Sequence, residues 1–326
     1  MNGTGTLDNL TIQGEMDVQN GQNLALVGTI QNEGNIAIAG SSTFADLQIG
    51  GAVSLTGGGT VTLTNSTLSR ITDDDGGGVL TNVDNTIQGR GFVGNNLVQI
   101  DNLVLGTIQA DQSGSSLVVD TSATTFDNFG TLSAINNSEL DVVGSTSNFG
   151  FVDVESGSRA EFDTLVNGIG GVLAGNGTID AIDEIINNGT ISLGNSPGTL
   201  TLDTDLDLGS SSSLEIELAG LSLFDELIVN GDVDLGGDLD LFLLDGYRPE
   251  EFDVFDVVLA DSFSGLFANV ADGGRLATSD GFGSFQVNYG GGGTVQLSQF
   301  SAVPEPGAVT ILMAVCVGLL ARRRRV

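Results

Sequence analysis

The feature that most constrains the fold of this chain is a short pattern that recurs along it. An asparagine is followed by a glycine, then by a threonine or another small step, and then by an aliphatic residue. The pattern occurs as NEGNI (32–36), NFGTL (128–132), NFGFV (148–152), NGTI (176–179) and NNGTI (187–191). Gly106, Gly130, Gly150 and Gly171 are 24, 20 and 21 residues apart. A period of this length is about one coil of a parallel β-helix, in which each coil stacks on the previous one.

Short alternating runs bounded by Gly, Asn, Asp and Ser predict β-strands, and residues 60–63 (TVTL) and 140–143 (LDVV) are examples. No stretch before residue 307 has a helical period with caps. We therefore predict an all-β chain whose residues 1–204 form a right-handed parallel β-helix with inward aliphatic ladders. Asn and Gly are expected in turns that require positive φ, where Asn side chains can bond along the stack. A β-sandwich is the alternative.

The repeat pattern changes near residue 205, where Asp- and Leu-rich runs replace it. We expect residues 205–300 to form a terminal β module and residues 301–326 to form a separate tail. The segment 231–241 carries Asp232, Asp234, Asp238 and Asp240 at alternating positions. Alternation predicts that these four side chains share one face of a strand.

The charge balance excludes several functions. The chain holds 42 acidic residues and nine basic ones, for a formal net charge of −33, so nucleic acid is excluded as a partner. The absence of His and Lys excludes a Ser-His-Asp triad, a His-containing zinc site, a Schiff-base lysine and a P-loop. Cys316 is the single cysteine, so no disulfide framework is possible. We expect that the protein is not an enzyme and needs no cofactor.

Two segments suggest chemistry and also have simpler explanations. Asp73, Asp74 and Asp75 precede three glycines, a composition that suits Ca²⁺ but also suits a solvated turn. The segment 85–91 (NTIQGRG), which contains Arg90, is similar to β-helix pectinases, and paired carboxylates could hydrolyse glycosides. The repeat itself also produces this sequence, as LTIQG at 10–14 shows.

The C-terminal tail has three parts in a fixed order. Pro304, Glu305 and Pro306 form an extended segment, and residues 307–321 form an apolar run that predicts a short transmembrane helix. The run ends at four arginines, Arg322, Arg323, Arg324 and Arg325, which the positive-inside rule holds on the cytoplasmic side. Cys316 inside the run suits a small buried hydrophobic residue better than a lipid attachment site.

These residues closely resemble the PEP-CTERM sorting signal of bacteria that make extracellular polysaccharide. The resemblance implies that a membrane-embedded exosortase recognises Pro304-Glu305-Pro306 and removes the hydrophobic tail. The chain would be anchored transiently in the inner membrane before it reaches the cell surface or the medium. Residues 170–202 also resemble the passenger-type β-helix repeats of secreted adhesins and autotransporters, and residues 211–267 resemble the module that often follows them.

The sequence thus predicts an exported structural or adhesive protein of the cell surface or extracellular matrix, with exopolysaccharide as a candidate partner. A secreted β-helix lyase or glycoside hydrolase is one alternative, and a calcium-dependent exopolysaccharide binder is another. The first residues, Met1 onward, already resemble a repeat and lack the features of a signal peptide. An exported protein needs such a signal, so we expect that the chain begins inside a longer gene product.

Overall fold

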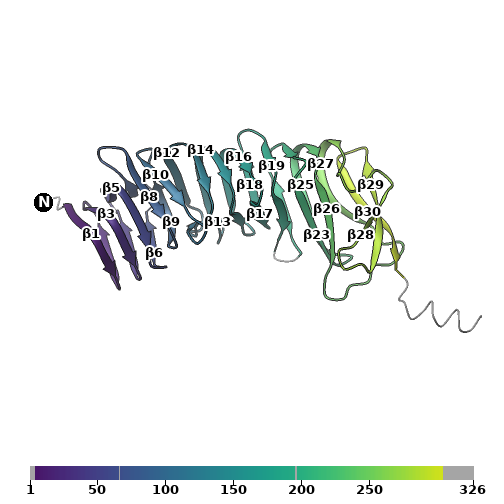
Figure 1. Ribbon diagram of the computed structural model, residues 1–326, viewed down its shortest axis with the longest axis horizontal. Coiled ribbons are helices and arrows are strands. Elements are labelled where there is room, and N and C mark those ends of the chain that lie inside the picture. The colour runs from purple at the N-terminus through teal and green to yellow at the C-terminus, as the bar shows by residue number, and fades with distance from the viewer. Residues whose placement is uncertain (1–3, 66, 195–196, 304–326) are drawn as a thin grey trace, which may run out of the picture.

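The protein is an elongated stack of β-strand coils. The computed structural model describes residues 4–65, 67–194 and 197–303, and every helix or strand element within them is a β-strand. The coils follow one another from the N-terminal end (purple) to the C-terminal end (yellow) of the rod (Figure 1). The fold is a parallel β-solenoid of about ten coils.

Two parallel sheets, here called sheets A and B, run along the rod. The strands of sheet A are β1 (Thr4–Ile12), β3 (Asn23–Asn32), β5 (Ala45–Thr56), β7 (Ser69–Thr72), β8 (Gly78–Asn82), β10 (Val98–Asn102), β12 (Ser116–Asn128), β14 (Glu139–Asn148), β16 (Arg159–Asn167), β18 (Thr178–Ala181), β19 (Ile185–Asn187), β21 (Thr199–Leu202), β22 (Leu206–Leu208), β25 (Glu226–Leu235) and β27 (Phe255–Gly265). The strands of sheet B are β2 (Glu15–Gln19), β4 (Asn35–Ala39), β6 (Thr60–Thr64), β11 (Thr107–Ala110), β13 (Thr131–Ala134), β15 (Phe151–Val154), β17 (Val172–Gly175), β20 (Thr190–Leu193), β23 (Ser213–Gly220) and β26 (Asp238–Leu243). The strand β9 (Thr86–Val93) contributes to both sheets.

Equivalent residues of successive coils lie in register. Thr107, Thr131, Phe151, Val172 and Thr190 are successive partners along sheet B. The repeat glycines stand immediately before these strands, so the period that they mark in the sequence is confirmed as one coil. The pairings of the longer sheet A strands contain breaks in register, as between Asp120 and Thr125 in the pairing of β12 with β14.

The core is a set of aliphatic ladders that run along the rod, as predicted. In sheet B, Leu132, Val152, Leu173 and Ile191 are consecutive partners and are fully buried. A strand with one buried face alternates apolar and polar residues, and for this reason the sequence alone predicted these strands. Removing one such Leu side chain would cost about 2–5 kcal/mol.

A second internal ladder is made of asparagine. Its members are fully buried at the end of sheet A in consecutive coils, and they are Asn82, Asn102, Asn128, Asn148, Asn167 and Asn187. From Asn82 to Asn167, each Nδ2 donates to the Oδ1 of the next asparagine at 2.6–2.9 Å. The amides also donate to a carbonyl of their own turn, as Asn148 does to Gly150 at 3.1 Å. The predicted bonding of Asn along the stack is confirmed.

The turn glycines beside this ladder are needed for a different reason from the one predicted. Gly130 and Gly150 do not adopt the positive φ that we expected at these turns. A Cβ on Gly130 would overlap the carbonyl oxygens of Gly106 and Leu103 in the preceding turn. Glycine is therefore required because stacked turns approach closely. Positive φ occurs at other Asn residues, such as Asn136 and Asn137.

An antiparallel sheet closes the C-terminal end of the rod. The strand β27 pairs in parallel with β25 and in antiparallel with β30 (Thr294–Ala302), which in turn pairs with β29 (Gly283–Gly290). The strand β28 (Arg275–Ala277) extends this sheet, and the two-residue strand β24 (Leu223–Phe224) is antiparallel to β23. Aromatic rings fill this end, with Phe255 and Phe285 edge to face at 5.8 Å.

Residue 205, where we expect the terminal module to begin, lies between β21 and β22, and both of these strands pair in parallel with β25. The hand of the solenoid stays a prediction. The predicted helix at 307–321 lies outside the described residues.

Candidate functional site

The calcium candidate at Asp73–Asp75 is a hydrogen-bonded turn between β7 and β8. The Asp73 carboxylate accepts the backbone N–H of Gly78 at 2.9 Å, and Asp74 and Asp75 are exposed. Within residues 4–65, 67–194 and 197–303, no group of three acidic or Cys side chains is arranged to hold a metal ion. The three aspartates therefore do not form a metal site in this conformation.

The four aspartates of segment 231–241 do not share one strand. The chain turns at Gly236 and Gly237, so that Asp232 and Asp234 lie on β25 of sheet A while the other pair lies on β26 of sheet B. The expectation of a single acidic face was wrong, because a two-glycine turn interrupts the alternation. The aliphatic residues between them, Val233, Leu235, Leu239 and Leu241, are buried in the core.

The pectinase-like segment 85–91 falls in and just before β9. Arg90 donates from Nε to the Thr64 carbonyl at 2.8 Å and from Nη1 to the Ser115 hydroxyl at 3.4 Å. Among the described residues, no carboxylate lies within ion-pair distance of Arg90. The structure thus brings no carboxylate pair to this arginine.

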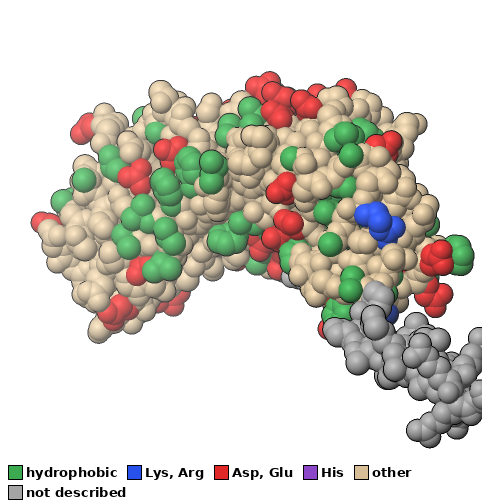
Figure 2. Space-filling model, turned by 45° about the vertical axis from the view of Figure 1, so that its right-hand side comes forward, with side chains coloured by type: hydrophobic (Ala, Val, Ile, Leu, Met, Phe, Trp, Pro, Cys, Tyr) green, Lys and Arg blue, Asp and Glu red, His purple; other side chains and the backbone are tan. Residues whose placement is uncertain are grey.

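Sheet A carries an acidic row that we did not anticipate. Asp141, Glu161 and Asp180 are successive outward-facing partners on β14, β16 and β18, and Asp203 follows in the next coil. The residues come from four consecutive coils, so their spacing along the stack is about 4.8 Å. Figure 2 shows one face of the molecule, on which acidic side chains (red) gather along the upper edge toward the C-terminal half.

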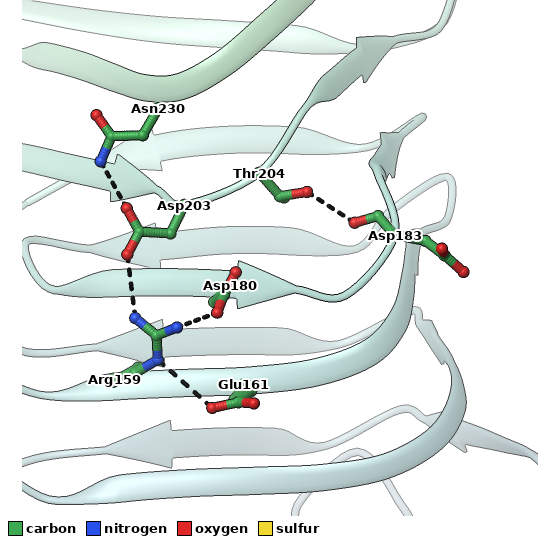
Figure 3. Close-up of polar contacts among 7 residues, drawn as sticks. All are labelled: Arg159, Glu161, Asp180, Asp183, Asp203, Thr204 and Asn230. Carbon is green, nitrogen blue, oxygen red and sulfur yellow. Dashed lines mark hydrogen bonds and ion pairs between the residues drawn. The ribbon is translucent and has the colours of Figure 1, made fainter.

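One arginine partly neutralises this row. Arg159 reaches across the coils to Asp180 and to Asp203 at 3.1 Å, and it also contacts Glu161 of its own strand at 3.6 Å (Figure 3). Asn230 donates to the other oxygen of Asp203 at 2.5 Å. The interactions are partly exposed, so each ion pair contributes little by itself, and their joint effect is to hold the carboxylates in one line.

Asp141, the member of the row that forms no ion pair with Arg159, has a raised pKa. The pKa of Asp141 is raised to about 6, chiefly by burial and in addition by the nearby charges of Glu161, Glu139, Asp163 and Asp120. Burial also raises the pKa of Asp120, with a contribution from Asp163. A group with this pKa can exchange a proton near neutral pH, or it can attract a cation.

Asp225 is a second perturbed carboxyl, and it has a structural role. Its side chain is 1% exposed and accepts the backbone N–H groups of Gly198 at 2.7 Å and Glu217 at 2.8 Å. Its pKa is raised to about 7, chiefly because the side chain is buried. The two backbone hydrogen bonds lower the pKa, and the charges of Glu217 and Glu215 contribute to the rise. Asp225 thus ties the start of β25 to β23 and to the segment before β21.

Sheet B presents a face of opposite character. From β4 to β13 the first two columns of this face hold only Asn, Ala, Thr, Gln and Ser, and Arg90 follows in the third column on β9. We call the first two columns the uncharged face; its residues are Asn35, Ala37, Thr60, Thr62, Thr86, Gln88, Thr107, Gln109, Thr131 and the buried Ser133. The face meets Phe151 in the next coil, whose side chain is 53% exposed. This polar, uncharged strip stands out on a chain with a net charge of −33.

Exposed apolar side chains also follow the turns outside the asparagine ladder. The rings of Phe129 and Phe149 stack with centroids 5.3 Å apart, and Val104, Leu105 and Ile169 are each more than 70% exposed in the neighbouring turns. Ring stacking along a solenoid corner stabilises the coils, and exposed apolar patches also mark interaction surfaces.

The sorting residues Pro304, Glu305 and Pro306, the arginines 322–325 and Cys316 lie outside the described residues. Within the described part of the chain, no helix has the length and apolar character to cross a bilayer. The sequence matches no protein-family model and no curated protein. The class that the structure defines is therefore the β-solenoid, and function must be inferred from the surfaces themselves.

Sequence reasoning missed the acidic row because its members are far apart in the chain. Asp141, Glu161, Asp180 and Asp203 are separated by 20, 19 and 23 residues. Alignment of the chain on the repeat glycines places Asp141 and Glu161 in one column, but it does not place Asp180 and Asp203 there, because the coils differ in length. The same alignment would have shown Phe151 replacing a threonine.

Proposed function

We propose that this protein is an exported structural or adhesive component of the bacterial cell surface or extracellular matrix. A C-terminal sorting signal delivers it, and an exosortase-type enzyme processes it while the helix at 307–321 is held in the inner membrane. The mature chain then resides on the cell surface or in the medium. The observation that carries the proposal is the tripartite tail, in which Pro304-Glu305-Pro306, an apolar run and four arginines occur in order.

The solenoid supports this role in two ways. A rod of stacked coils presents long, regular outer faces, which suits contact with an extended polymer or a second surface better than it suits capture of one small molecule. The high negative charge keeps such a rod soluble and opposes non-specific adsorption to anionic surfaces.

The experiment that tests delivery is the intact mass of the protein from the envelope and medium of a host with the sorting system. We expect loss of the residues after the Pro-Glu-Pro segment. A Pro304→Ala/Pro306→Ala variant should keep its tail, whereas Pro249→Ala, a proline in the loop between β26 and β27, should be processed normally. A full-length tail retained in the inner membrane for the unaltered chain would refute the proposal.

The second candidate is a polysaccharide lyase or glycoside hydrolase, and the pKa of Asp141 is the observation that favours it. A catalytic carboxyl needs such a shift, since it must hold a proton near the working pH. The acidic row lies on an outward sheet face, however, where partner carboxylates outnumber the one arginine. We expect no cleavage of neutral or acidic polysaccharides by the purified chain, measured as release of reducing ends. Activity that disappears in Asp141→Asn would establish the enzyme instead.

A further inference from the structure

Phe151 departs from the pattern of its column in sheet B. The outward position that it occupies holds valine in the next coil, at Val172, and threonine in five other coils, at Thr60, Thr86, Thr107, Thr131 and Thr190. Threonine suits a half-exposed strand position, so the solenoid does not require an aromatic ring there. The ring is nevertheless 53% exposed to solvent.

A depression lies beside this ring on the outer face of sheet B. It has a volume of about 370 Å³ and is lined by Thr131, Phe151, Asp153, Ala174, Gly175, Ser192 and Gly194. These residues come from β13, β15, β17 and β20 and from the turn that follows β20, so the depression runs along the rod across four coils. Ala174 and Gly175 of β17, which lie beside Asp153 and Val154, contribute little side-chain volume to the depression. The dimensions suit one or two sugar units of a chain that continues in both directions.

The polar groups of the depression suit hydroxyl-rich ligands. The half-buried Asp153 carboxylate has no hydrogen-bond donor among the residues that the structure describes, and Thr131 and Ser192 supply hydroxyls. Burial raises the pKa of Asp153, and the charge of Glu155 raises it further. A ligand hydroxyl that donates to this carboxylate would supply a hydrogen bond that it lacks.

The charge of the surroundings selects among polymers. Toward the N-terminal side, the depression opens onto the uncharged face, whose hydroxyl and amide groups recur in each coil. An anionic polysaccharide would be repelled by the net charge of −33, whereas a neutral one would not. The apolar C–H face of a sugar ring packs well on an exposed phenylalanine, because both surfaces are flat and weakly hydrated.

We infer that this depression binds a neutral polysaccharide, with one sugar ring stacked on Phe151 and its hydroxyls bonded to Asp153 and Ser192. The polymer continues along the uncharged face. The inference rests on the proposed surface role and names the partner that the role needs.

Affinity electrophoresis in native gels tests this inference. The purified full-length chain is kept in a neutral detergent and run through gels that contain hydroxyethyl cellulose, dextran or galactomannan, with polygalacturonate as the anionic comparison. We expect at least one neutral polymer to retard the protein. Phe151→Thr restores the residue of the neighbouring coils and should weaken binding roughly tenfold. Phe252→Ala, which removes an 87% exposed ring from the loop after β26, should bind like the unaltered chain.

Four outcomes would overturn the inference. They are equal retardation of the unaltered chain and Phe151→Thr, retardation by polygalacturonate alone, no retardation by any of the three neutral polymers, and a dimer by light scattering that Phe151→Thr converts to monomer. The last outcome would make this face a contact between two copies. The measurement needs no sorting machinery, so its failure is distinct from a failure of tail processing.

Discussion

At the scale of single residues, the buried asparagines do what a hydrophobic core cannot. Asn128, Asn148 and Asn167 each donate to the next coil and to their own turn, while the side-chain oxygen accepts from the coil before. A shift of one coil by a single residue would leave these groups buried without partners. The ladder therefore fixes the register of the stack, and the aliphatic ladders supply most of the stabilisation.

Replacing a ladder asparagine should be costly. We expect Asn148→Ala to lower the free energy of unfolding by about 2–4 kcal/mol, because it leaves Asn128 and Asn167 partly unsatisfied in a dry interior. Asn176→Ala, at a half-buried turn position with no side-chain hydrogen bond among the described residues, should cost less than about 0.5 kcal/mol. Urea unfolding followed by circular dichroism measures the free energy of unfolding of both variants. Equal losses would show that a ladder asparagine contributes no more to stability than a turn asparagine.

Asp225 should give stability a pH dependence of known sign. Its pKa in the folded protein is about 7, against an ordinary value of 3.8, so the folded state holds the proton over a range in which the unfolded state has lost it. The contribution to stability is therefore full below about pH 4 and is lost as the pH rises through 7. We expect Asp225→Asn to flatten the decline in melting temperature between pH 5 and 8. If the melting temperature of Asp225→Asn declined with pH as steeply as that of the unaltered chain, other carboxyl groups would be the cause of the decline.

At the scale of elements, the turn that joins sheet A to sheet B is the part of the coil that tolerates least change. The asparagine, the glycine and the first strand residue of one turn lie directly on those of the turn before. Gly14 occupies the same place in the first described coil, between β1 and β2, but an added Cβ there would meet no atom within 4 Å. A comparison of alanine substitutions at Gly130 and Gly14 therefore distinguishes steric crowding by the preceding turn from the backbone flexibility of glycine.

We expect opposite effects of alanine at these two positions. Gly130→Ala should lower the free energy of unfolding by about 1–3 kcal/mol, because its methyl group overlaps the preceding turn. Gly14→Ala should leave stability unchanged or raise it by about 0.4–1 kcal/mol, since it restricts only the unfolded chain. Urea unfolding of both variants checks this, and a loss of stability in Gly14→Ala would point to the backbone instead of to crowding.

The fold was predictable from the sequence to the level of the coil, because the asparagine-glycine pattern reports both the period and the stacked turn. The inward positions of Leu132 and Val152 followed from alternation. The function of the turn glycines was not predictable, since close approach of two turns depends on the coil spacing and not on local φ. The acidic row required the register of distant strands, which short motifs do not contain. The replacement of a threonine by Phe151 was visible in the repeat pattern, but the exposure of its ring was not.

At the scale of the whole molecule, charge and hydrogen bonding are distributed unequally around the rod. Sheet A carries the acidic row with Arg159 as its one close cation among the described residues, while sheet B carries the uncharged face. The rod therefore presents two surfaces with different preferences, and a neutral polymer on one leaves the other free for cations.

The acidic character should make stability depend on ionic strength more than on any particular ion. We expect the melting temperature to rise between about 10 and 300 mM NaCl, because screening weakens repulsion among the carboxylates. At equal ionic strength CaCl₂ and MgCl₂ should act alike, and EDTA should have no effect. A calcium-specific rise that EDTA reverses would favour the calcium-dependent binder.

The direction of the sheet hydrogen bonds also sets how the rod carries load. Because strands of successive coils lie across the rod, their backbone bonds point along its axis, and a pull between the two ends opens them in sequence instead of shearing them together. Each coil released would add roughly 20 residues, or about 70 Å of extended chain. The antiparallel sheet around β27 and β30 resists differently from the coils, so peeling should start in the solenoid. Under tension the molecule would lengthen in steps and would dissipate mechanical energy between the structures attached to its two ends.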